Sequence, residues 1–68
     1  MDEEQFNRSL RGLLKQFGIT AQREVEKAVR DALEQGTLRG NEVLSARATM
    51  TVQGLGDPIQ VDGRIELG

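Results

Sequence analysis

Three basic side chains near the start of the chain have the type and spacing that can bind an anion. Arg8, Arg11 and Lys15 are three and four residues apart, with no acidic residue between them. On a helix this spacing puts them on one face, where they would contact the phosphates of a nucleic acid. The other interpretation is a solvated face on which Glu4 pairs with Arg8 one turn later. We favour the solvated face, because the net charge is -2 and phosphate binding needs clustered positive charge.

Side chains that support catalysis or metal binding are few. The chain has no Cys and no His, so it lacks thiolate nucleophiles and the common zinc ligands. No two carboxylates have the paired spacing typical of acid–base catalysis. Gly54-Leu55-Gly56 has no predicted helix after it, so we interpret it as a turn and not a phosphate-binding loop. We therefore expect no enzymatic activity, no catalytic residue, no cofactor and no metal ion.

The first half of the chain predicts two helices, at about residues 2–17 and 20–35. Asp2 is placed to cap the first helix, and Gln5 to complete a capping box. Gly18 is expected to end that helix, and Gly36 to end the second one. Each helix has one apolar side, made by residues three and four apart. These are Phe6, Leu10, Leu13, Leu14 and Phe17 in the first helix, and Ala21, Val25, Ala28, Val29, Ala32 and Leu33 in the second.

The last third predicts two strands, at about residues 44–53 and 59–67. Apolar and polar residues alternate in both segments, which places each apolar set on one side of a pleated strand. Gly63, inside the second strand, indicates a bulge or a close approach. Cross-strand charge favours Arg47 opposite Glu66 and not opposite Arg64, with Thr51 opposite Asp62 and Val52 opposite Val61. The residues expected to be most buried are Leu13, Leu14, Val25, Val29, Met50, Val52 and Ile65.

These elements predict an α+β fold of one domain over residues 1–68. Two N-terminal helices would pack on one face of a C-terminal antiparallel β-hairpin (ααββ). The sequence resembles a small bacterial domain family of unknown function, built as two helices and a hairpin. The segments that carry this resemblance are Gln5-Phe6-Asn7, Gln22-Arg23-Glu24-Val25-Glu26, Leu38-Arg39-Gly40-Asn41-Glu42 and Asp62-Gly63-Arg64-Ile65. The resemblance implies no activity and no functional residue.

A chain of 68 residues without disulfides or metals buries a small core, so self-association is the expected route to stability. We predict a homodimer, with an unidentified protein as a further partner. The chains would pair through the strand edges into a four-stranded sheet, or through the helical face of Ala21, Ala28 and Ala32. The predicted function is a small self-associating interaction module, and the alternative is a nucleic-acid-binding module that uses the basic helix face. The acidic start of the chain is unlike a signal peptide, and no apolar run could span a membrane, so we expect a cytoplasmic location.

Overall fold

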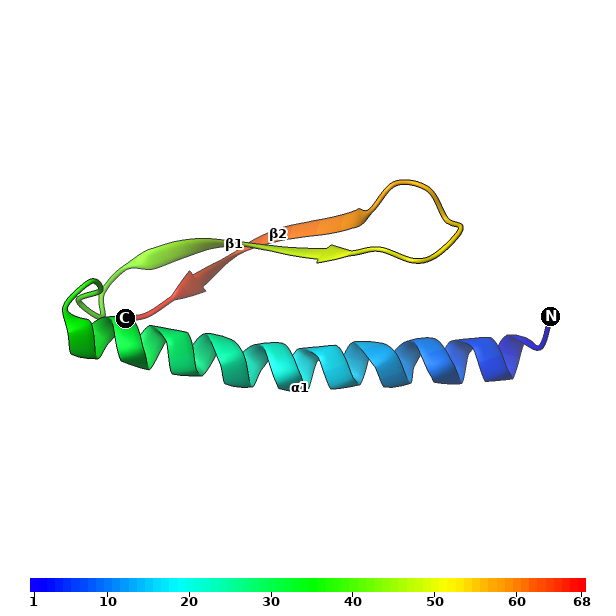
Figure 1. Cartoon of the computed structure of the whole chain (residues 1–68), viewed down its shortest axis with the longest axis horizontal. Coiled ribbons are helices and arrows are strands. Elements are labelled where there is room, and N and C mark those ends of the chain that lie inside the picture. The colour runs from blue at the N-terminus through cyan, green and yellow to red at the C-terminus, as the bar shows by residue number, and fades with distance from the viewer. The chain divides into compact units, whose positions relative to one another are not determined.

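The computed structural model describes residues 1–68 as one helix followed by one hairpin (Figure 1). The helix α1 spans Glu3–Gln35, and the strands β1 and β2 span Val43–Met50 and Ile59–Glu66. The chain divides into two compact units, Met1–Thr37 and Leu38–Gly68. The α+β class and the antiparallel hairpin are confirmed, but the prediction of two helices is wrong.

The helix begins where the sequence predicts. Asp2 has extended backbone angles (φ -92°, ψ 106°), and its Oδ1 accepts a hydrogen bond of 3.1 Å from the backbone N–H of Gln5. Glu3 and Glu4 in the first turn add negative charge at the positive end of the helix dipole. The Gln5 side chain makes no return bond to Asp2, so only half of the predicted capping box forms.

Gly18 does not end the helix, contrary to prediction. It lies inside α1 and does not have the positive φ that a helix-ending glycine adopts. The apolar positions continue past it without a break, from Leu14 and Phe17 to Ala21 and Val25, with helical spacing. A single interior glycine costs a helix about 1 kcal/mol relative to alanine, which is too little to break one that continues on both sides.

Gly36 does end the helix, as predicted. Its φ is +79°, in the left-handed region. Its N–H donates to the Leu33 carbonyl at 3.2 Å, and the N–H of Thr37 donates to the Ala32 carbonyl at 2.9 Å. This pair of bonds is the Schellman motif. The Thr37 hydroxyl adds a third bond, at 3.1 Å, to the same Ala32 oxygen.

The hairpin pairs in a register that differs from the predicted one. Arg47 lies opposite Asp62 and not Glu66, and Ser45 lies opposite Arg64. Arg47 does lie opposite an acid, as expected, but this acid is Asp62, which is four residues before Glu66 in the chain. Pairing runs one to one from Val43↔Glu66 to Met50↔Ile59, so Gly63 forms no bulge. A Cβ at Gly63 would have nothing within 4 Å, so no close approach requires glycine there.

The connection between the strands explains this register. It is longer than predicted, because β1 ends at Met50 and residues 51–58 form the loop. Gly54 and Gly56 have φ of +83° and +81°, and the Leu55 N–H donates to the Val52 carbonyl at 3.2 Å. The tight turn thus includes Val52, which the prediction placed in the strand. The Glu42 carbonyl extends the ladder beyond the strands by accepting from the N–H of Leu67 at 2.9 Å.

No residue of the chain is buried, so neither unit has a core of its own. Of the expected core residues, Val29, Met50 and Ile65 are half-buried, whereas Leu13, Leu14, Val25 and Val52 are exposed. The physical reason lies in the element count. Each unit taken alone is one layer, a single helix or a two-stranded sheet, whereas a core needs at least two packed layers.

Candidate interaction surfaces

The helix carries a continuous apolar line along its length, which we call the helix stripe. Because α1 has no break, residues from both predicted helices share one face. Their spacing is four, four and three residues, which then repeats, so the pattern has a period of eleven. The stripe consists of Phe6, Leu10, Leu14, Phe17, Ala21, Val25, Ala28 and Ala32.

Side-chain size differs sharply between the two halves of the helix stripe. The N-terminal half holds two phenylalanines and two leucines, whereas the C-terminal half holds three alanines and Val25. The large side chains are open to solvent, with Phe6 47% and Phe17 53% exposed. The N-terminal half is therefore a row of protruding side chains, and the C-terminal half is a shallower strip that Val29 and Leu33 border.

The hairpin has one apolar face, as the alternation predicts. The pairs across this face are Leu44↔Ile65, Ala46↔Gly63, Ala48↔Val61 and Met50↔Ile59. The residues near the open ends of the strands, Leu44 and Ile65, are half-buried, whereas Val61 and Ile59 toward the turn are 64% and 57% exposed. The turn end of this face is thus an open apolar surface.

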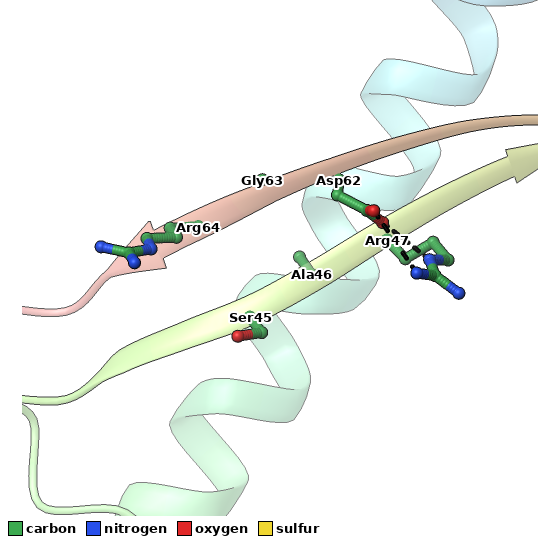
Figure 2. A pocket seen from close by; sticks show the side chains of 6 residues that line it. All are labelled: Ser45, Ala46, Arg47, Asp62, Gly63 and Arg64. Carbon is green, nitrogen blue, oxygen red and sulfur yellow. Dashed lines mark hydrogen bonds and ion pairs between the residues drawn. The ribbon is translucent and has the colours of Figure 1, made fainter.

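The opposite face of the hairpin is polar and contains one ion pair. Arg47 Nε donates to Asp62 Oδ1 at 2.6 Å, and a second guanidinium nitrogen lies 3.4 Å from the other carboxylate oxygen. Figure 2 shows the Asp62 carboxylate directed from β2 toward the Arg47 guanidinium, while Arg64 points away from this pair. Both paired side chains are more than half exposed, so the pair supports the register more than it stabilises the fold.

Both strands are edge strands, since the sheet has only the order β1-β2. Each strand therefore presents one row of backbone N–H and C=O groups that no other strand pairs. Such rows accept a further strand. Ser45, Arg47 and Arg64 belong to the polar face of the sheet.

The predicted basic residues lie together, but acids lie next to them. Arg8, Arg11 and Lys15 are all exposed on α1, as the spacing predicts. Arg8 and Arg11 line a shallow hollow with Glu3, Glu4 and Asn7. The expected Glu4–Arg8 pair does not form, and the one ion pair of the helix joins Arg30 to Glu26 at 3.5 Å. The role of the three basic residues as anion or nucleic-acid contacts stays a prediction.

Glu42 has a structural role that the sequence reasoning did not assign. Its carboxylate accepts two bonds from the Arg39 N–H, at 2.8 and 3.1 Å, and one from the Gly40 N–H at 2.9 Å. The bonds from Arg39 and then from Gly40 lower the pKa of the Glu42 carboxyl below its usual value. The signal in the sequence is a carboxylate two residues after a glycine in a turn, where backbone donors are unpaired.

The structure contains no group of three or more acidic side chains close enough to hold a metal ion. The helix is not apolar enough along its length to cross a membrane.

Comparison with known proteins gives one match. The model of a protein family described as a family of unknown function (DUF6494) matches residues 1–68, the whole chain. No significant match was found among curated proteins or among solved structures. The predicted resemblance to a small family of unknown function is confirmed.

Proposed function

The chain belongs to a family of unknown function, DUF6494, and we propose that it is a self-associating protein-interaction module, most simply a homodimer, without catalytic activity. The observation that carries this proposal is the absence of any buried residue, together with the exposure of thirteen large apolar side chains. An apolar surface of this extent is typical of a protein that meets a partner. The proposal includes a cytoplasmic location, for which the support is the cysteine-free composition.

The need for a partner follows from each unit taken alone. A helix without tertiary contacts is marginal in water even when its sequence favours helix. A two-stranded hairpin is also marginal, and usually needs a third strand or a packed helix. No disulfide or metal ion is available to stabilise either unit. A second copy of the chain would supply helix faces and strand edges in equal number.

Sedimentation equilibrium of the full chain at micromolar concentration tests the proposal. We expect a dimer that dissociates on dilution. Leu14→Asp, on the helix stripe, should weaken association about 100-fold or more, because each dimer loses two buried leucines. Gln16→Asp is the matched control, since it adds the same charge to the opposite helix face and should change association only slightly.

A chain that stays monomeric at the highest soluble concentration would refute the proposal. Equal association of both variants would show that the helix stripe takes no part in it.

A further inference from the structure

We propose that two copies of the chain pair through their helix stripes in the antiparallel direction. In this pair a residue of one copy faces the residue of the other copy for which the two residue numbers add to 38. This inference rests on the proposed self-association and names its interface. It depends on α1 being one helix, because two separate helices would not align the two halves of the stripe. The helix stripe of one copy therefore packs against the helix stripe of a second copy.

Side-chain size supports the antiparallel direction. With numbers that add to 38, Phe6 faces Ala32 of the second copy, and Leu10 faces Ala28. Phe17 faces Ala21 in the same way. These three large side chains then enter the shallow strip beside an alanine, which keeps the two helices at a similar separation at both ends of the stripe. The remaining large residue of the N-terminal half, Leu14, lies near Val25 of the second copy, one position away from facing it directly.

A parallel pair would have the opposite property. It would place Phe6 against Phe6 and Phe17 against Phe17 at one end, and alanine against alanine at the other. Helices forced apart by phenylalanines at one end cannot bring the alanines into contact at the other without bending. Voids along the alanine half would forfeit packing energy.

Charge disfavours the parallel direction. Residues 8–15 carry three basic side chains and no acid, whereas residues 23–30, which face them when the numbers add to 38, carry three bases and two acids, a net charge of +1. An antiparallel pair therefore places each basic segment beside a more nearly neutral segment of the other copy. Arg11 and Glu26 lie on the same flank, each one residue after a stripe residue, and their numbers add to 37. A parallel pair would instead bring the two basic segments together.

The eleven-residue period predicts how the two helices wind. A period of eleven corresponds to slightly more than 3.6 residues per turn, so the stripe drifts slowly around a straight helix in the right-handed sense. The pair would therefore cross with a shallow right-handed supercoil, unlike the left-handed one of a seven-residue repeat.

Disulfide cross-linking tests the register directly, because the chain has no cysteine of its own. Leu10→Cys and Ala28→Cys variants of the full chain are oxidised separately and as an equal mixture. Antiparallel pairing should give the mixed disulfide in the mixture and little cross-linking of either variant alone. In that arrangement two copies of residue 10 are about 27 Å apart along the helix axis. The control mixture of Gln16→Cys and Arg23→Cys, on the outer face, should stay uncross-linked.

Each outcome has a definite meaning. Cross-linking of each variant to itself would overturn the antiparallel direction in favour of a parallel pair. A dimer by sedimentation that forms no disulfide with either variant or with the mixture would overturn the helix interface and leave the proposed self-association standing. A monomer by sedimentation would refute the proposed function itself.

A charge exchange provides a second test that leaves the stripe intact. Arg11→Glu and Glu26→Arg each place like charges at both flank contacts of a homodimer, so each variant should associate roughly 3- to 10-fold more weakly. Mixed together, the two variants restore opposite charges at both contacts, so the heterodimer should predominate. Native mass spectrometry of the mixture measures this distribution. A statistical mixture of homodimers and heterodimers would overturn the register.

Discussion

The helix and the hairpin differ in which groups they leave without a partner, apolar side chains or backbone hydrogen-bonding groups. The helix pairs its backbone groups internally and caps both ends, through Asp2 at the start and Gly36 at the end. Its remaining exposed feature is a line of apolar side chains. The hairpin leaves a row of backbone groups on each outer edge as well as an apolar face. A partner for the helix must therefore supply side chains, whereas a partner for the hairpin can supply a strand.

Two glycines in the helix unit give the largest expected effects on stability, and in opposite directions. Gly36→Ala forces an alanine into the left-handed region and should destabilise the helix end by about 1 kcal/mol or more. Gly18→Ala should stabilise the same helix by up to about 1 kcal/mol, since the added Cβ meets nothing within 4 Å. Chemical denaturation followed by helical circular dichroism measures both. Stabilisation by Gly36→Ala would contradict the helix end described above.

The contrast between Gly18 and Gly36 also shows why the sequence predicted the helix only in part. Both glycines follow an apolar stretch, so local spacing alone makes either one a stop. What distinguishes them is that the apolar period continues across Gly18 and ceases at Gly36. The larger period of eleven, which spans both predicted helices, carries that information. A prediction made one helix at a time does not use it.

Strand register and burial were less predictable for different reasons. Arg47 can meet an acid in more than one register, with Asp62 or with Glu66, and charge alone does not choose between them. The loop decides the register, because Gly54 and Gly56 place a tight turn where strand was expected.

Alternation correctly identified the apolar side of each strand. It could not show whether anything covers that side, which depends on a second layer outside the chain's own local pattern. The basic residues Arg8, Arg11 and Lys15 were correctly placed on one face, and the acidic first turn beside them was expected, although the expected Glu4–Arg8 ion pair does not form.

Glu42 should make the hairpin unit sensitive to acid. Its carboxyl pKa is lowered in the folded chain, because the ionised form accepts the Arg39 and Gly40 bonds. The stabilisation is therefore present above the pKa of the unfolded chain and is lost as the pH falls through the folded value. Glu42→Gln should weaken the protection of the Arg39 and Gly40 amides at neutral pH and make it insensitive to acid. Amide exchange measured between pH 3 and 7 checks this.

Glu66→Gln is the matched control for that experiment, since no backbone N–H donates to the Glu66 carboxylate. It should leave the exchange of both amides unchanged. If Glu42→Gln also leaves them unchanged, the Glu42 carboxylate does not hold this turn.

The smallest expected effect compares one ion pair from each unit. The Arg47–Asp62 pair in the hairpin has its closest contact at 2.6 Å and a second nitrogen in reach, whereas the Arg30–Glu26 pair in the helix is a single contact of 3.5 Å. Both pairs are solvent-exposed, so each is worth at most about 1 kcal/mol, and a helix pair at this spacing about 0.3–0.5 kcal/mol.

Double-mutant cycles with alanine at both positions of each pair give the two coupling energies. We expect the hairpin coupling to be the larger, because the cross-strand geometry allows two contacts and the strands already hold the residues opposite each other. The hairpin coupling should fall as salt rises. A hairpin coupling of zero at low salt would mean that the loop alone sets the register and that Arg47 lies opposite Asp62 as a consequence of it.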